Sequence, residues 1–125
     1  MPRIFIIDDD SDLLHAVRTV LKKSGYEVET YNDWLDAKNA IKEKDPQLIL
    51  LDVFMRGIDG LAVCQQLKGS PFTRHIPILL FSGYPRIAEK AIDDYGADDF
   101  LAKPFEVGEL LEKVHSLLSA KGITV

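Results

Sequence analysis

Polar side chains that could bind a cation or an anion directly follow several apolar runs of strand length. In chain order they are Asp8, Asp9, Asp52, Ser82 and Lys103. Carboxylates held close together repel one another and resist ionising together unless a cation lies between them. Mg²⁺ suits such a site, because it prefers oxygen ligands and is usually held by one or two carboxylates with water and phosphate oxygens. These residue types therefore predict a magnesium site that could also take a phosphoryl group.

Apolar runs of strand length alternate with stretches of helical periodicity along the chain. We expect strands at residues 3–7, 26–31, 48–51, 76–81 and 98–102.

The starts of the helices can also be predicted. Either Asp10 or Ser11 is expected to cap the first helix, and either Asn32 or Asp33 the second. Pro85 is well placed to begin the fourth helix. The stripes expected to be buried include Trp34, Leu35, Ala37, Ala40 and Ile41; then Ile87, Ala88, Ala91 and Ile92; and finally Val107, Leu110, Leu111, Val114, Leu117 and Leu118.

The run Leu48–Leu51 consists of four aliphatic residues, which is typical of a central strand buried on both faces of a parallel sheet. Five strands alternating with five helices predict an α/β fold with helices on both faces. We expect a flavodoxin-like (βα)5 architecture, a doubly wound parallel sheet in the order 2-1-3-4-5. In that order ligands bind beyond the carboxyl ends of strands one and three. Asp8, Asp9 and Asp52 follow those two strands.

The composition is that of a single globular domain. The chain has 125 residues, of which 46% are hydrophobic and 28% charged. The net charge of −5 argues against direct binding of nucleic acid. The apolar runs are too short for a membrane span or a signal peptide, and the one cysteine, Cys64, cannot form an internal disulfide. We therefore expect a cytoplasmic protein that does not enter a membrane.

Several motifs on these elements resemble the receiver domains of two-component response regulators, and the resemblance covers nearly the whole chain. The motifs are Asp8-Asp9, Asp52-Val53-Phe54-Met55 with Asp59-Gly60, Ser82, Phe100 and Lys103-Pro104-Phe105. The resemblance implies that residues 1–125 form one receiver domain, with no output domain in this chain.

The resemblance also implies a role for each motif residue. Asp52 would accept a phosphoryl group from a histidine kinase or a histidine phosphotransfer protein. Mg²⁺ or Mn²⁺ would be held by Asp8, Asp9, Asp52 and the backbone carbonyl of Phe54. Lys103 and Ser82 would contact the phosphoryl oxygens, and a cis peptide bond before the following proline would aim the lysine into the site.

The output of such a domain is a change of surface. The side chains of Ser82 and Phe100 would switch together, with the phenylalanine rotating inward, and would alter the face formed by the fourth helix, fifth strand and fifth helix. That face would contact a downstream protein or output domain, or a second copy of the chain upon phosphorylation. The domain would be a signalling switch that assists its own phosphorylation and dephosphorylation, not an enzyme acting on a separate substrate.

Two other classes of function remain open at this point. A magnesium-dependent phosphatase or phosphotransferase could use Asp8 as its nucleophile and Asp10 as its acid and base. Against it, the chain has no inserted cap segment with which to bind a small substrate. A phosphate-independent interaction module could also retain the fold.

The chain departs from the family pattern at several positions. Arg56 stands where proline is common, Ser82 where threonine is, and Phe100 where tyrosine is frequent. The segment between Ser82 and Lys103 is slightly short, which predicts a trimmed fourth helix. Phe54 and Tyr84 occupy positions that flank the path of an attacking water in this family. Two bulky rings there predict a long-lived phosphoaspartate.

Overall fold

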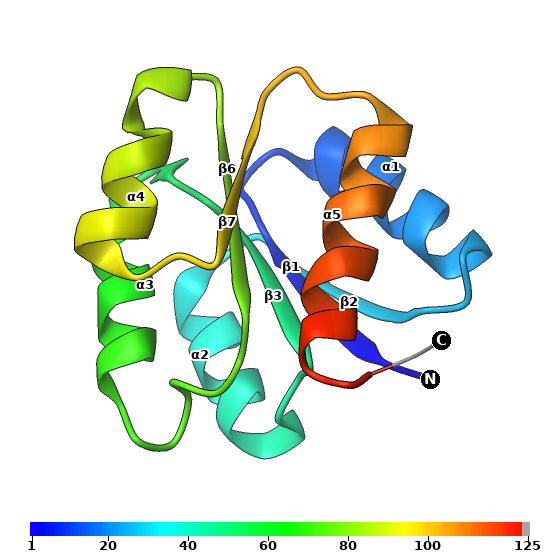
Figure 1. Ribbon diagram of the computed structural model, residues 1–125, viewed down its shortest axis with the longest axis horizontal. Helices are drawn as coiled ribbons and strands as arrows, with labels where there is room; N and C mark the ends of the chain where they lie inside the picture. The colour runs from blue at the N-terminus through cyan, green and yellow to red at the C-terminus, as the bar shows by residue number, and fades with distance from the viewer. Residues whose placement is uncertain (124–125) are drawn as a thin grey trace.

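In the computed structural model, which describes residues 1–123, five strands form one parallel sheet between two layers of helices (Figure 1). The sheet contains β1 (Arg3–Ile7), β2 (Glu27–Tyr31), β3 (Leu48–Asp52), β6 (Ile78–Ser82) and β7 (Asp99–Ala102). Their spatial order is β2-β1-β3-β6-β7, and all neighbours are parallel. Because β6 and β7 are the fourth and fifth strands of this sheet, the predicted order 2-1-3-4-5 is confirmed.

The helices divide into two groups, one on each face of the sheet (Figure 1). On one face lie α1 (Ser11–Lys23) and α5 (Val107–Ala120), and on the other α2 (Trp34–Lys44), α3 (Gly60–Gly69) and α4 (Ala88–Tyr95). Each face has its own apolar core, because side chains alternate along a strand. Phe5 and Ile7 of β1 pack toward α2 and α3, whereas Ile4 and Ile6 pack toward α1 and α5.

Aspartates cap α1, α2 and α3, whereas no side chain that the structure describes caps the first residues of α4 or α5. The carboxylate of Asp10 accepts hydrogen bonds from the backbone N–H groups at the start of α1, and Asp33 and Asp59 do the same for α2 and α3. Side-chain oxygens that satisfy these free N–H groups fix where a helix begins. Of the residues that the sequence left open, the caps are therefore Asp10 and Asp33.

A short hairpin between β3 and α3 was not predicted from the sequence. It pairs β4 (Phe54–Met55) with β5 (Ile58–Asp59) in antiparallel fashion. Gly57 makes its turn possible, because its φ of 70° lies in the left-handed region that favours glycine. The hairpin brings Arg56 to a turn at the edge of the sheet where β3 ends.

Among the predicted stripe residues whose burial the structure describes, a set that leaves out Ala88, the prediction was wrong for three. Leu35, Ile92 and Val107 are exposed rather than buried. Ala37 and Ala91 face the core, and at 100° per residue Leu35 and Ile92 project well away from them. Val107 is the first residue of α5, one turn before Leu110, the first residue of that helix to be buried.

The fourth helix is short, as expected, but does not begin at Pro85. A 3₁₀ turn, η1 (Pro85–Ile87), comes first, and α4 follows with eight residues. Gly96 ends α4 with a φ of 80°.

None of the helices in residues 1–123 combines the length and apolar character that crossing a membrane requires.

Candidate functional site

The carboxyl ends of the strands bring the polar residues singled out in the sequence to one edge of the sheet, the upper edge in Figure 1. Asp52 and Ser82 are the last residues of β3 and β6, Asp8 follows β1 directly, and Lys103 follows β7. Because β1 and β3 are neighbours, the aspartates that end them are held side by side.

Asp8, Asp9 and Asp52 form a cluster of carboxylates. One oxygen of each lies within 4.8 Å of the others. Asp8 and Asp52 are buried and Asp9 is partly buried. Three carboxylate oxygens at this separation offer the donor set that a hard divalent cation prefers, so these residues fit a magnesium or manganese ion.

Lys103 reaches this cluster from the end of β7, the strand two places from β3 in the sheet. Its Nζ lies 2.8 Å from Oδ2 of Asp8 and 3.3 Å from Oδ1 of Asp52. Its backbone N–H donates to the carbonyl of Ser82, and the Lys103-Pro104 peptide bond is cis, as expected. The lysine thus supplies a positive charge to two buried carboxylates at once.

The surroundings of Asp52 make its ionised form costly. Burial, and after it the charge of Asp8, raise its pKa from 3.8 to about 6, although the ammonium of Lys103 opposes both effects. A carboxylate with a perturbed pKa on a strand end is typical of functional sites. A cation bound beside Asp52 would lower this pKa again and stabilise the ionised form.

Ser82 is buried beside this cluster, and its hydroxyl oxygen accepts a hydrogen bond of 3.1 Å from the backbone N–H of Tyr84. The hydroxyl proton remains available for donation. Phe100, which faces the core from β7, is only 7% exposed. An inward rotation of this ring was expected upon activation, but the ring is already buried here.

Two aromatic rings lie against each other beside the acidic cluster. Phe54 of β4 and Tyr84, which precedes η1, are 56% and 64% exposed, yet their ring centroids are only 4.9 Å apart in an edge-to-face arrangement. Edge-to-face pairs are attractive. The contact joins the segments that follow Asp52 and Ser82, and sequence reasoning predicted the two rings but not their contact.

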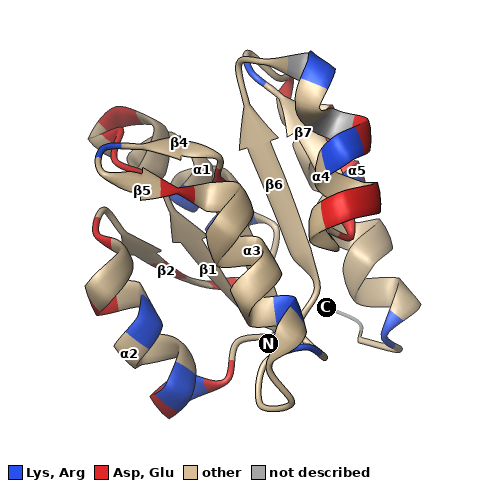
Figure 2. Ribbon diagram, turned by 90° about the vertical axis from the view of Figure 1, so that its left-hand side faces the viewer, with Lys and Arg blue, Asp and Glu red and all other residues tan. Residues whose placement is uncertain are grey.

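Arg56, at the turn of the β4–β5 hairpin, contacts the third carboxylate. Its backbone N–H donates to Oδ2 of Asp9 over 2.9 Å, and its Nε lies 3.7 Å from the same oxygen. Figure 2 shows this basic hairpin turn on the β4–β5 ribbon. Sequence reasoning noted Arg56 only as a departure from the family, because the contact depends on a hairpin whose strands have two residues each.

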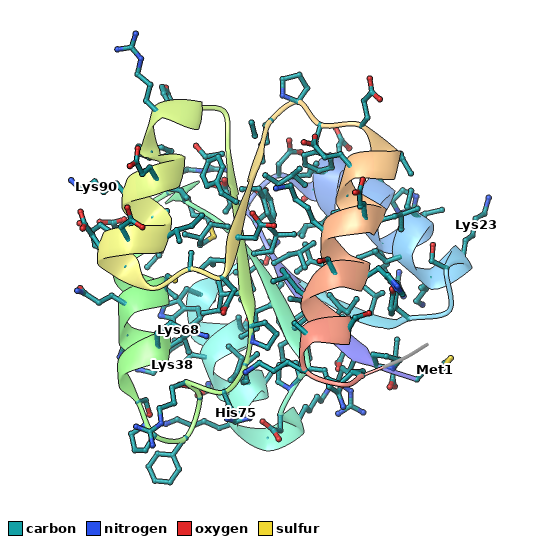
Figure 3. All side chains as sticks on the ribbon, viewed as in Figure 1. Met1, Lys23, Lys38, Lys68, His75 and Lys90 are labelled. Atoms are coloured by element: carbon teal, nitrogen blue, oxygen red, sulfur yellow. The ribbon has the colours of Figure 1, made fainter. Side chains whose placement is uncertain are left out.

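The histidines do not gather at this edge. His75 lies at the opposite end of the sheet (Figure 3), where its Nε2 is 3.1 Å from a carboxylate oxygen of Asp45. His15 and His115 are exposed residues of α1 and α5. The three histidines thus lie on separate elements, as the sequence indicated.

The profile of the response regulator receiver domain matches residues 4–115 of the chain. The chain belongs to this family. Among curated relatives of this receiver domain, the DNA-binding dual master transcriptional regulator RpaA of Synechocystis is 40% identical over 119 residues, which are 94% of the chain and 49% of the relative. Response regulator MprA of Mycobacterium tuberculosis is 38% identical over 117 residues, 93% of the chain and 50% of the relative. The chain thus spans about half the length of these relatives.

Solved structures agree with the receiver fold. A putative response regulator from Chloroflexus aurantiacus superposes with a TM-score of 0.88 at 34% identity, covering 95% of this chain and 99% of the other. The receiver domain of a signal transduction histidine kinase from Syntrophus aciditrophicus also gives a TM-score of 0.88, at 32% identity, covering 100% and 96% of the two chains. The predicted family and fold are therefore confirmed.

Proposed function

We propose that Asp52 of this receiver domain accepts a phosphoryl group from a phosphohistidine on a histidine kinase or a histidine phosphotransfer protein. The observation that carries the proposal is the position of Asp52, a buried carboxylate that shares the ammonium of Lys103 with Asp8 and lies within 4.8 Å of both other acids. Phosphoryl transfer needs mainly positioning and charge neutralisation, which these groups provide.

In the proposed reaction a carboxylate oxygen of Asp52 attacks phosphorus in line with the leaving imidazole nitrogen. The new bond is an acyl phosphate O–P bond, and the P–N bond breaks with its electron pair returning to the imidazole. Negative charge spreads over the equatorial phosphoryl oxygens during transfer. Lys103, whose ammonium lies 3.3 Å from Asp52, would neutralise part of this charge.

Asp8, Asp9, Asp52 and the backbone carbonyl of Phe54 would hold Mg²⁺ or Mn²⁺. A bound divalent cation would neutralise charge on the carboxylates and the phosphoryl group. Asp9 has the most exposed carboxylate of the three acids, which favours it as a direct ligand. The buried Asp8, already bonded to Lys103 and to the backbone N–H of Asp10, would act mainly through water.

Ser82 and Phe100 would carry the phosphorylation signal to the surface. The hydroxyl of Ser82 can donate to a phosphoryl oxygen, while its own oxygen already accepts from Tyr84. Because Phe100 is buried, the switch would begin from an inward ring that phosphorylation locks in place. The face formed by α4, β7 and α5 would then bind a downstream protein or output domain, or a second phosphorylated copy.

The domain boundary is also part of the proposal. Residues 1–125 would act as one receiver domain, and the regulated output would belong to another domain or protein. RpaA is named as a DNA-binding transcriptional regulator, and it is about twice as long as the matched segment. The negative net charge of −5 supports an output through protein contacts of this domain rather than its own binding of nucleic acid.

Intact mass spectrometry after incubation with phosphoramidate tests the phosphoacceptor. We expect one added phosphoryl group on the wild type with Mg²⁺, and none on Asp52→Asn or in EDTA. Asp10→Asn, which alters an acid that caps α1, serves as a control and should gain the group normally. Phosphorylation of Asp52→Asn to the same extent would refute the proposal.

The phosphatase alternative makes a different prediction about Asp10. Its carboxylate accepts from the N–H groups of Asp12 and Leu13 and is thereby engaged in the helix cap. This engagement counts against a role as acid and base. Loss of phosphorylation in Asp10→Asn would favour the alternative.

A further inference from the structure

We propose that Arg56 is a resident counter-ion of Asp9 that opposes the binding of a divalent cation, and so sets the magnesium affinity of the site. The inference rests on the proposed function, because it concerns the same metal site. Nothing about it requires Arg56 to touch the phosphoryl group. Arg56 is a positioning residue that acts through Asp9.

The distribution of positive charge within the cluster points to this role. Lys103 lies within 4 Å of Asp8 and Asp52, whereas the cation beside Asp9 is Arg56, with Nε 3.7 Å from Oδ2. Each of the three acids therefore has a cationic side chain beside it. A divalent ion that approaches Asp9 meets a carboxylate whose charge is already partly balanced, and also meets a like charge close by.

Because the side chain of Arg56 lies at the surface, its effect on the binding of a divalent cation at Asp9 is small and reversible. The side chain of Arg56 is 93% exposed, and exposed ion pairs contribute little free energy. The guanidinium can therefore swing away when a metal ion binds. From the typical strength of exposed pairs we expect removal of the charge to tighten magnesium binding by about two- to five-fold.

The side chain and the backbone N–H of Arg56 both contact Oδ2 of Asp9, and substitutions can separate their effects. The backbone N–H donates to Oδ2 of Asp9 over 2.9 Å, and any residue except proline keeps that donor. Arg56→Ala removes the charge alone, Arg56→Lys keeps a charge, and Arg56→Pro removes both the charge and the N–H. Comparison of the three variants therefore assigns the effect to the charge or to the hydrogen bond.

A tryptophan close to Arg56 can report metal binding at Asp9 by its fluorescence. Trp34, the one tryptophan of the sequence, lines a shallow cavity together with Asp9, Arg56 and Met55. Indole fluorescence responds to nearby charge, so metal binding at Asp9 is expected to alter it. Backbone amide shifts around the β4–β5 hairpin give a second reading of the same equilibrium.

Magnesium titrations of the unphosphorylated protein, followed by amide NMR shifts and by Trp34 fluorescence, test the inference without any measurement of activity. We expect Arg56→Ala to lower the dissociation constant about two- to five-fold and Arg56→Lys to stay near the wild type. The difference between wild type and Arg56→Ala should shrink as ionic strength rises, because exposed charges are screened.

Arg74→Ala is the matched control, because it removes the same charge from an exposed arginine next to His75, at the opposite end of the sheet (Figure 3). Equal affinities of Arg56→Ala and the wild type would overturn the inference while leaving the metal site intact. An equal gain in Arg74→Ala would also overturn it, since net charge would then be the cause. A wild type without any magnesium binding would overturn the proposed metal site as well.

Discussion

Asp52 has surroundings that raise the free energy of its ionised form. Burial and the neighbouring Asp8 raise its pKa to about 6, although Lys103 stands 3.3 Å away. The folded protein therefore stores an unfavourable charge at neutral pH. A metal ion bound beside this carboxylate would offset that cost and stabilise its ionised, nucleophilic form.

This raised pKa predicts a pH-dependent effect of Asp52→Asn on stability. Folding tightens proton binding at Asp52, so its contribution to the free energy of unfolding is full below pH 4 and is lost as pH rises to about 6. Above pH 6 in EDTA, Asp52→Asn should be more stable than the wild type by about 1–3 kcal/mol, relative to their difference at pH 4. Urea denaturation at both pH values measures this. A constant difference between the two proteins would contradict the assigned pKa.

Phe54 and Tyr84 predict the lifetime of the phosphorylated state. Their rings, 4.9 Å apart, lie beside the segments that end in Asp52 and Ser82 and would narrow the approach of an in-line water. Phe54→Ala and Tyr84→Ala should each hydrolyse the phosphoaspartate several-fold faster, measured as loss of the phosphorylated mass over time. Phe72→Ala, which removes an exposed ring from the loop at the other end of the sheet, is the control. An unchanged rate in both ring variants would exclude this role.

At the level of single residues, the sequence predicted which side chains would meet but not how they pair. Apolar runs ending in Asp8, Asp52 and Lys103 sufficed to place these residues on one edge. The pairing of Lys103 with two acids, and of Arg56 with the third, depends on loop geometry that no periodicity encodes.

At the scale of elements, the junction between β3 and α3 is held by a close approach at Gly60. Its N–H donates to the carbonyl of Val53 over 2.8 Å. A Cβ at Gly60 would stand 2.7 Å from Cα of Val53 and closer still to the carbonyl oxygen of Asp52, both of them backbone atoms that cannot rotate away. The start of α3 can therefore lie against the strand end only with glycine at this position.

Gly60→Ala should accordingly destabilise the protein by about 2–4 kcal/mol, because the start of α3 must shift to accommodate the methyl group. Gly69→Ala, at the last residue of the same helix, meets nothing within 4 Å and should change stability by less than about 1 kcal/mol. Urea denaturation of both variants provides the comparison. Equal free energies of unfolding for Gly60→Ala and Gly69→Ala would show that the junction between β3 and α3 can shift without cost to accommodate the methyl group.

The long elements were predictable from the sequence, whereas the short ones were not. The strand Leu48–Asp52 is long enough to show as a continuous apolar run, and the helix Val107–Ala120 is long enough to display a period. The two-residue strands β4 and β5 do not. The buried stripes were overextended to Leu35 and Ile92, because apolar character alone does not fix the rotation of a helix about its axis.

At the scale of the whole molecule, topology explains why the site lies where it does. Parallel strands in the order β2-β1-β3-β6-β7 place the ends of β1 and β3 side by side at the point where strand order reverses. The order itself was expected from a common pattern of doubly wound sheets, since periodicity identifies strands but not their neighbours.

This arrangement predicts that magnesium stabilises the folded chain as a whole, because the cluster is assembled from β1 and β3 only upon folding. At a magnesium concentration ten times the dissociation constant, the free energy of unfolding should rise by about 1.4 kcal/mol. Thermal denaturation across a magnesium series measures the gain. Asp9→Asn should abolish most of it, and an equal gain in this variant would argue against the cluster.

The most direct test of the central claim is to locate the phosphoryl group. After phosphorylation by phosphoramidate with Mg²⁺, borohydride reduces an aspartyl phosphate to homoserine, and peptide mass mapping identifies the residue. We predict homoserine at position 52 alone. Homoserine at position 8 would contradict the assignment of Asp52 as phosphoacceptor and would favour a phosphatase-like reaction at the end of β1.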